Sequence, residues 1–335
     1  MSRLGIFVNR QTLSSSEQLT ALIKCRDAAE SMGHTAEFIF PVDINRIPKR
    51  DALFIRANTD PMNATYVASR IASLYGIPVI DDPASIQICS DKINMYLHLM
   101  KKNLPIPRTV FPSKREIAPE YARALFERLG TPLVLKEPST SFSARVEKAS
   151  NVQEFMKISK RFLRLSDWIV VQEYVPSSFD WRIGVLNGEF LYACRYVIPS
   201  QTFKIQASVN GHLVYCGVES VPPEDVPAEI IDLGIEAGKA IGKGLYGVDI
   251  KESKGRLYVI EVNDNPSLDG GEDVCYPDVY RRIISYLING DQYAETLSYM
   301  PSRMDSYMGE ARFDPSTQNV LGSEEPLAYR IDFER

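Results

Sequence analysis

Histidine and paired cysteine are scarce in this chain of 335 residues. It has three histidines and five cysteines, with no Cys-x-x-Cys pair and no two histidines at the spacing of metal ligands. The sequence therefore gives little support to a Ser-His-Asp triad, a histidine-rich metal centre, a structural zinc site or a disulfide framework. What it has in quantity is carboxylate, lysine and arginine, the side chains that handle phosphate and hard metal ions.

Long runs of like charge and of apolar residues are also missing. Lysine and arginine number 38 against 43 aspartates and glutamates, and this net charge of −5 without a basic tract argues against a nucleic-acid-binding protein. No apolar stretch approaches the roughly 18 residues that span a bilayer, and the apolar part of the N-terminus is too short for a secretory signal. We therefore expect a cytoplasmic protein with neither a membrane nor a nucleic acid as its partner.

The first 88 residues predict a small α/β domain. Short apolar strands near 4–8, 36–40, 52–55 and 79–80 alternate with two helices, and this order predicts a mostly parallel sheet. The segment contains no Gly-x-Gly-x-x-Gly sequence, so a dinucleotide-binding site has no support there.

The rest of the chain divides into three parts. Residues 89–168 begin with a helix at about 90–102, whose apolar face is predicted to be Ile93, Leu97 and Met100, and continue into a lobe of strands and helices. Strands dominate residues 169–290. Residues 291–335 are polar, contain three prolines and have no periodicity, so we expect a peripheral tail.

Segment 247–263 carries the strongest local signal, two strands joined by a tight turn. Because side chains alternate along a strand, Glu261 and Asn263 should face one way and Ile260 the other, and Asp249 on the partner strand can join the first group. Two carboxylates and an amide against an apolar backing suit one or two Mg²⁺ ions. A solvated polar edge of a hairpin is the alternative interpretation.

Two lysines stand where a phosphate could be held. Lys136 ends an apolar strand directly before a serine-rich loop with Ser141 and Ser143, so free backbone N–H groups would lie beside its ammonium. Lys92 lies in the first turn of its helix, the end that favours anions. A lysine considered alone is more often a solvated surface charge, but two of them together with a metal-type strand pair favour phosphate binding.

Polar side chains on later strands could complete a site for a ribose, a carboxylate or a phosphoryl group. They follow or interrupt an apolar strand at 170–175, and each could equally belong to a structural ion pair or a surface strand. They are Glu173, Asp180, Arg182, Arg195 and, as the weakest of the set, Lys204.

Seven short motifs in this order resemble the ATP-grasp superfamily and, within it, the RimK-like carboxylate-amine ligases. The motifs are Ser90-Asp91-Lys92, Leu104-Pro105-Ile106-Pro107-Arg108-Thr109, Pro132-Leu133-Val134-Leu135-Lys136, Val171-Gln172-Glu173-Tyr174-Val175, Asp180-Trp181-Arg182, Gly247-Val248-Asp249-Ile250 and Glu261-Val262-Asn263. Segments 52–56 and 77–83 also resemble the leading domain of such proteins.

The resemblance implies a combined α/β and α+β architecture. A small N-terminal α/β (pre-ATP-grasp) domain, 1–88, would precede a two-lobed ATP-grasp fold. Residues 89–168 would supply a linker helix and the lid lobe, 169–290 the C-terminal lobe with the metal site, and 291–335 the polar C-terminal tail.

The resemblance also implies a role for each candidate residue, with ATP clamped between the two lobes. The phosphates would contact Lys92 and Lys136, and the other candidate nucleotide-binding residues are the lid serines Ser141 and Ser143 together with Lys204. The adenine would contact the main chain of Glu173, Tyr174 and Val175, and the ribose would lie near Asp180. Asp249, Glu261 and Asn263 would hold Mg²⁺, or Mn²⁺ in its place. Arg182 and Arg195 would be catalytic, facing the γ-phosphoryl group and the acceptor carboxylate.

The implied reaction is amide formation. ATP would phosphorylate a substrate carboxylate to an acyl phosphate, and an amine would then displace phosphate. The implied partners are small-molecule or peptide acids and amines, and a second copy of the chain by analogy with paired ATP-grasp proteins. Ala144-Arg145-Val146 stands where relatives carry a glycine. That change favours one alternative that stays open, an ATP-binding regulatory or scaffold protein without turnover. A phosphotransferase that stops at the phosphorylated product is the other alternative.

Overall fold

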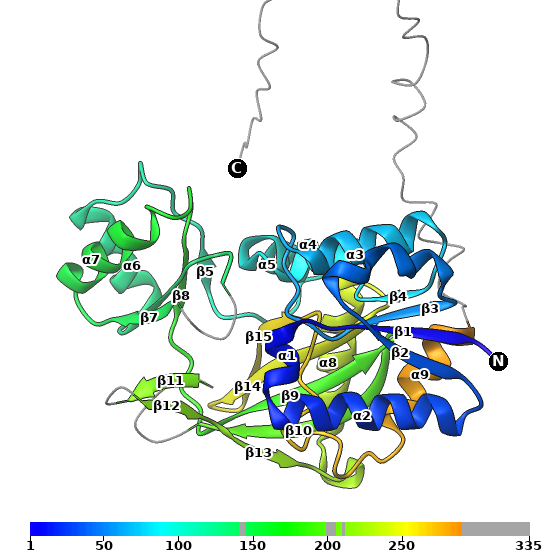
Figure 1. Cartoon of the computed structure of the whole chain (residues 1–335). Helices are drawn as coiled ribbons and strands as arrows, with labels where there is room; N and C mark the ends of the chain where they lie inside the picture. Colours follow the sequence, from blue (N-terminus) through cyan, green and yellow to red (C-terminus); the bar gives the residue numbers. More distant parts are fainter. Residues whose placement is uncertain (141–144, 199–205, 210–211, 290–335) are drawn as a thin grey trace, which may run out of the picture. The chain divides into compact units, whose positions relative to one another are not determined.

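The computed structural model describes residues 1–140, 145–198, 206–209 and 212–289 (Figure 1). Contacts divide the chain after Tyr293, and every element named below lies before that point. Among the described residues, no helix is both long and apolar enough to cross a membrane.

The first sheet is parallel throughout, which confirms the prediction for this segment. Its strand order is β2-β1-β3-β4. The strands are β1 (Arg3–Phe7), β2 (Thr35–Ile39), β3 (Ala52–Ile55) and β4 (Val79–Ile80). Helices α2 (Ser16–Ser31) and α3 (Ala64–Leu74) cover opposite faces (Figure 1). Leu4 and Ile6 are buried in the same cluster as Leu22 of α2, whereas Phe7 belongs to the cluster that contains Ala68 of α3.

Three short elements that the sequence pattern did not predict join these strands and helices. They are α1 (Arg10–Ser14), the 3₁₀ segment η1 (Pro41–Lys49) and α4 (Pro83–Cys89). Side chains cap two of them, since Asn9 accepts a hydrogen bond from the backbone N–H of Thr12 and Asp82 accepts from Ala84 and Ser85.

A second sheet, with order β5-β8-β6-β7, is antiparallel and has its own apolar core. The strands are β5 (Thr109–Val110), β6 (Leu133–Lys136), β7 (Val146–Ala149) and β8 (Val170–Glu173), and the helices are α6 (Pro119–Leu129) and α7 (Val152–Phe162). Leu133 and Leu135 are buried in the cluster with both helices. Alternation along β6 turns Val134 and Lys136 to the other face. That face is the one that lines the pocket described below.

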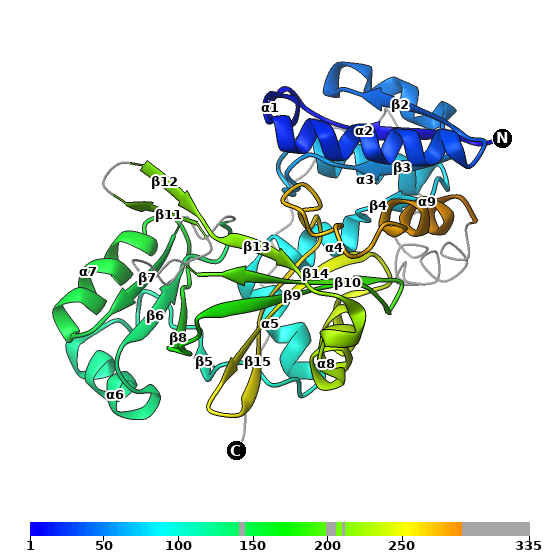
Figure 2. The ribbon, with the colours of Figure 1, turned by 90° about the horizontal axis from the view of Figure 1, so that it is seen from below.

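A third, five-stranded antiparallel sheet has the order β13-β10-β9-β14-β15 (Figure 2). Its strands are β9 (Phe179–Leu186), β10 (Glu189–Val197), β13 (Gly217–Ser220), β14 (Leu245–Ser253) and β15 (Arg256–Asn263). Helix α8 (Ala228–Ile241) packs on it closely, because a Cβ on Gly234 would stand 2.6 Å from Cγ2 of Ile183. Two further elements accompany this part of the chain, a hairpin of β11 (Gln206–Val209) and β12 (His212–Tyr215), and the 3₁₀ turn η2 (Pro223–Asp225).

Two helices link parts of the chain that are distant in sequence. Helix α9 (Val279–Asn289) packs against α2 and β3, so the end of the described chain completes the core beside the first sheet. Helix α5 (Lys92–Lys101) contacts α8 and β15. The apolar face predicted for α5 is partly wrong, because Leu97 is 51% exposed whereas Met95, Tyr96 and Leu99 are fully buried.

Candidate active site

A polar pocket is lined by residues of α5, of the second sheet and of the five-stranded sheet. Eight residues that the sequence predicted for the site line it. They are Lys92, Lys136, Glu173, Tyr174, Val175, Asp180, Asp249 and Glu261. The fold therefore brings predicted phosphate, base, ribose and metal residues to one place.

Lys136 is held at the end of β6 with little access to water. It is 7% exposed, its ammonium donates a hydrogen bond to Oη of Tyr96 at 2.8 Å, and it lies 5.3 Å from the Tyr96 ring centroid. Burial lowers the pKa of Lys136 to about 8, although the charges of Glu261, Asp180 and Asp249 raise it in part. Within the described ranges no carboxylate forms an ion pair with this buried cation, so a phosphate could take the place of an anionic partner.

Lys92 reaches the pocket from the first turn of α5. Asp91 caps this helix by accepting a hydrogen bond from the backbone N–H of Asn94. Lys92 is 5% exposed, and its ammonium lies 3.4 Å from Oε1 of Glu261 and donates to the carbonyl oxygen of Thr140. Lys92 thus contacts both Glu261 of β15 and Thr140, which lies in the segment after β6.

Glu261 stands beside an irregularity in β15. Asp249 is its partner in the ladder, but the next residue of β14, Ile250, pairs with Val259, so Ile260 is an extra residue. Ile260 consequently lines the same pocket as Glu261, and the prediction that it faces the other way is wrong. Burial raises the pKa of Glu261, but Lys92 and Lys136 lower it by more, so this carboxylate stays ionised.

Asp249 is tied to Arg182 on the neighbouring strand β9. Nε of Arg182 donates to Oδ1 of Asp249 at 2.5 Å and Nη2 donates to Oδ2 at 2.9 Å, in a pair that is nearly inaccessible to solvent. Nδ2 of Asn263 lies 3.3 Å from the same Oδ2. Asp249 thus lies beside Glu261 in the ladder and contacts Asn263, which does not line the pocket, while the guanidinium of Arg182 occupies both oxygens of Asp249. The role of these three residues as metal ligands stays a prediction.

Arg195 does not line the pocket. Its guanidinium lies 4.5 Å from the ring of Trp181 and 5.0 Å from that of Phe179, and its buried Nε has no hydrogen-bond partner among the described residues. Arg182 is also absent from the lining. The catalytic role of both arginines stays a prediction.

The predicted base-binding segment is anchored by Arg108. The side chain of Glu173 accepts hydrogen bonds from the backbone N–H of Arg108 at 2.9 Å and from its Nε at 2.7 Å. The backbone N–H of Glu173 donates to the carbonyl oxygen of Arg108 at 3.0 Å. The side chain and the backbone N–H of Glu173 are thus both engaged with Arg108, and the contact of its main chain with a base stays a prediction.

Lys251 is a pocket residue that the sequence analysis missed. Its ammonium forms an ion pair with Asp180 and donates to Oγ of Ser177 at 2.7 Å. Lys251 follows the run of buried residues in β14 and lies near the turn to β15, so it looked like an ordinary surface charge. The usable signal was its position two residues after Asp249, on the same face of the strand.

The loop after the metal-type strand is fastened to the first sheet. Nη1 of Arg56, just beyond β3, donates to Oδ1 of Asn265 at 2.6 Å and to the carbonyl oxygen of Pro266 at 3.0 Å. Asn265 in turn donates to the carbonyl oxygen of Ala57 at 2.7 Å. These reciprocal bonds connect two segments more than 200 positions apart.

Several predictions concern residues outside the described part of the chain. Ser141, Ser143 and Lys204 lie there, as do Ala144 and the tail from 290 onward. Arg145 is described, and its Nη1 lies 3.6 Å from Oε2 of Glu137.

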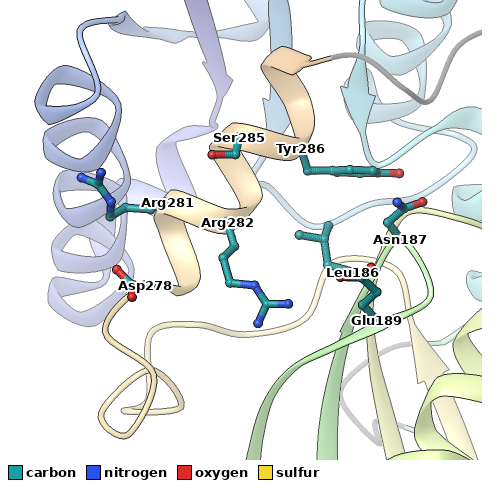
Figure 3. A pocket seen from close by; sticks show the side chains of 8 residues that line it. All are labelled: Leu186, Asn187, Glu189, Asp278, Arg281, Arg282, Ser285 and Tyr286. Carbon is teal, nitrogen blue, oxygen red and sulfur yellow. The ribbon is translucent and has the colours of Figure 1, made fainter.

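A larger depression of about 490 Å³ lies elsewhere, between α9 and the turn that joins β9 to β10 (Figure 3). None of the predicted site residues lines it. Its two arginines are already engaged, because Arg282 donates to the carbonyl oxygen of Phe190 at 2.8 Å and Arg281 to Oγ of Ser31 at 3.0 Å. Asp278 and Glu189 add two acidic groups, so the depression offers no uniform charge to a ligand.

Solved structures of ATP-grasp proteins share this fold. D-alanine–D-alanine ligase from Bacillus anthracis superposes with a TM-score of 0.65 at 18% identity, covering 87% of this chain and 97% of that one. The complex of the same ligase with ATP gives a TM-score of 0.64. At this identity the likeness concerns the fold alone.

Sequence comparison is more specific. Probable alpha-L-glutamate ligase 1 of Shewanella denitrificans is 26% identical over 292 residues, which cover 82% of this chain and 95% of that protein. The glutamate–LysW ligase ArgX of Sulfolobus acidocaldarius is 26% identical over 256 residues, 74% of this chain and 86% of that protein. The family model of the RimK-like ATP-grasp domain matches residues 89–287, more than half of the chain. The chain belongs to the RimK-like ATP-grasp family.

Proposed function

We propose that the protein phosphorylates the carboxylate of an amino acid or peptide with ATP and transfers the acyl group to an amine. Membership of the family and the ligase names of its relatives make it an ATP-dependent carboxylate-amine ligase that forms C–N bonds. One observation carries the assignment of the site. Four buried charged side chains from α5, β6, β9 and β14 converge on one pocket. They are Lys92, Lys136, Asp180 and Asp249.

The donor set at this pocket fits Mg²⁺, with Mn²⁺ as the alternative ion. The described residues hold no group of three or more acidic, histidine or cysteine side chains placed for a metal. Asp249, Glu261 and Asn263 instead offer two carboxylates and one amide oxygen. Mg²⁺ is commonly held by one or two carboxylates together with substrate phosphates, so this smaller set suffices. The ion would neutralise charge on the transferring phosphoryl group.

The chain's own residues would position the phosphates and stabilise the charge that develops on them. Lys92 and Lys136 would exchange their present contacts, with Glu261 and Tyr96, for phosphate oxygens. Arg182 would hold Asp249 in place beside the metal site through its two hydrogen bonds. No protein nucleophile is required, because the substrate carboxylate itself attacks the γ-phosphorus.

Glutamate is the substrate that the relatives' names suggest, as either the acid or the amine. Their names specify alpha-L-glutamate and glutamate–LysW ligation. We extend only the class to this chain, an α-amino acid joined to a second amino acid or peptide. Since ATP and Mg²⁺ are cytoplasmic reagents, we place the reaction in the cytoplasm. We also propose a homodimer, which light scattering after size-exclusion chromatography would test.

Substitution of Glu261 by glutamine tests the assignment. The change keeps the shape of the side chain and removes one negative charge from the proposed metal site, and ADP release that depends on both an acid and an amine substrate should fall about a hundredfold or more. Circular dichroism should stay that of the wild type. Glu252→Gln, on the exposed side of the partner strand, is the matched control and should leave turnover unchanged.

Two results would contradict the proposal. A well-folded Glu261→Gln protein with wild-type turnover would remove the metal site from this pocket. Tight binding of Mg·ATP by the wild type, without ADP release for any pair in a mass-spectrometric screen of pooled amino acids and peptides, would instead favour an ATP-binding scaffold.

A further inference from the structure

The edge of the five-stranded sheet that carries Glu261 is closed by helix α5. Strand β15 is the last in the strand order, and an edge strand leaves backbone N–H and C=O groups without a ladder partner. The extra residue Ile260 adds to this, because it also interrupts the pairing with β14. Helix α5 contacts this strand (Figure 2), so its side chains can satisfy groups that the sheet leaves open.

Two buried side chains of α5 hold the backbone on either side of Glu261. The hydroxyl of Tyr96 donates a hydrogen bond to the carbonyl oxygen of Ile260 at 2.6 Å. Sδ of Met95 accepts one from the backbone N–H of Val262 at 3.1 Å. Both side chains are fully buried. These two bonds fix the peptide groups that precede and follow the Cα of Glu261.

The same face of α5 also reaches the side chain of Glu261. Lys92, Met95 and Tyr96 stand at positions i, i+3 and i+4 of the helix and therefore share one face. The ammonium of Lys92 lies 3.4 Å from Oε1 of Glu261. One helix face thus contacts the carboxylate and both peptide groups that flank it.

The hydroxyl of Tyr96 has a single proton, and the shorter contact identifies its acceptor. Oε1 of Gln172 lies 3.3 Å from this hydroxyl, against 2.6 Å for the carbonyl oxygen of Ile260. The bond from Lys136, at 2.8 Å, uses a lone pair of the hydroxyl and does not compete for its proton. The bond to Ile260 can therefore persist when Lys136 turns to a phosphate.

We propose that Tyr96 and Met95 are positioning residues that orient Glu261 toward Mg²⁺. The inference rests on the proposed metal site and deepens it, because it makes the geometry of that site depend on α5 as well as on the sheet. Mg²⁺ demands a nearly ideal octahedral arrangement, and groups behind a ligand keep it in the right orientation. Small rotations of the peptide groups beside Glu261 should therefore weaken metal binding before they change the fold.

Calorimetry of ADP binding to the full chain, with and without Mg²⁺, tests this inference. We call the ratio of the two affinities the Mg²⁺ enhancement. Tyr96→Phe leaves the carbonyl oxygen of Ile260 without its donor and should reduce the enhancement about twofold to tenfold, the factor expected for one hydrogen bond. An effect that acts through Lys136 on the phosphates would change both affinities and cancel in the ratio.

Two further variants separate positioning from a loss of structure. Tyr276→Phe removes a hydroxyl bond of the same length, to the carbonyl oxygen of Val221, at a residue that does not line the pocket. It should lower the melting temperature and keep the wild-type Mg²⁺ enhancement. In the double variant Tyr96→Phe with Glu261→Gln, the reduction caused by Tyr96→Phe should disappear, because the carboxylate that Tyr96 orients is gone.

Met95→Leu gives an independent measurement, and it decides the question if Tyr96→Phe does not fold. Leucine keeps most of the buried volume, but the N–H of Val262 loses its acceptor. Because a thioether is a weak acceptor, the Mg²⁺ enhancement should fall by a smaller factor, about twofold to threefold. A wild-type enhancement in Met95→Leu would then contradict the proposal.

The outcomes distinguish this inference from the proposed function. A wild type that binds ADP equally well with and without Mg²⁺ overturns the metal site and the inference together. If the wild type shows the enhancement and a Tyr96→Phe protein with wild-type circular dichroism retains it in full, the inference alone is wrong. It is also wrong if Tyr96→Phe causes the same reduction in the Glu261→Gln background, since Tyr96 would then act on another group.

Discussion

Nucleotide binding should be coupled to the uptake of a proton by Lys136. In the nucleotide-free pocket burial lowers the pKa of this lysine to about 8, so a large part of the population is neutral in mildly alkaline solution. A phosphate next to the ammonium favours the charged form and should return the pKa to its ordinary value of roughly 10.

The expected stoichiometry follows from these two pKa values. The difference in bound protons between the complex and the free protein is about 0.1 at pH 7, about 0.5 at pH 8 and about 0.8 at pH 9. Calorimetric titration with Mg·ADP in buffers of different ionisation enthalpy measures this number directly, as the slope of the observed binding enthalpy against the buffer's enthalpy.

Lys136→Arg is the matched control. Arginine keeps the positive charge but stays protonated throughout this pH range, so the proton number should be close to zero at every pH. The reasoning fails if the wild type takes up no proton at pH 8 to 9. It fails equally if the arginine variant takes up as many protons as the wild type.

Other substitutions address binding, stability and the tail. Lys92→Ala and Lys136→Ala should each weaken ADP binding by about 1–3 kcal/mol in calorimetry, and unchanged affinity in both would refute the phosphate site. Lys136→Met should raise the melting temperature of the nucleotide-free protein at pH 7, because a lysine with a folded pKa near 8 costs roughly 3 kcal/mol below that pH. This gain in melting temperature should shrink between pH 8 and 10. In that range the unfolded wild type binds more protons than the native wild type, so the stability of the wild type rises with pH. Gly184→Ala should cost about 1–3 kcal/mol in urea unfolding, because the new Cβ overlaps the buried ring of Tyr192, whereas Gly217→Ala, whose Cβ would meet only Cβ of Val197 at 3.8 Å, should be nearly neutral. A chain ending after Gln292 should keep its unfolding transition in a calorimetric scan, and failure to fold would show that the tail is not peripheral.

Local patterns in the sequence predicted the first sheet and part of the pocket, whereas the two-lobed architecture was predicted from the resemblance to ATP-grasp proteins. The parallel first sheet follows from strand and helix order, and the convergence of Glu261 with Asp249 follows from pairing across a tight turn. Lys136 could be placed because it ends an apolar strand before a loop. Each of these depends on neighbours in sequence or on regular alternation.

The features that could not be predicted depend on irregular pairing or distant contacts. The extra residue in β15 turns Ile260 into the pocket, and hydropathy carries no sign of it. The buried face of α5 includes Lys92 and Tyr96, because that face borders a polar pocket. Apolar periodicity alone therefore predicted the wrong face, which contains the exposed Leu97. Lys251 acquires its role only from Asp180 and Ser177, some 70 positions earlier.

The bonds between Arg56 and Asn265 bear on how sequence variants of this protein should be interpreted. By position in the chain Arg56 belongs to the first domain, far from every ATP-grasp motif. By contact it belongs to the loop that begins directly after Asn263, a proposed metal ligand. A substitution at Arg56 would release that loop on the side of the first sheet and change the geometry at Asn263 and Glu261. Variants at this position should therefore be grouped with active-site variants, and their first effect should be on turnover.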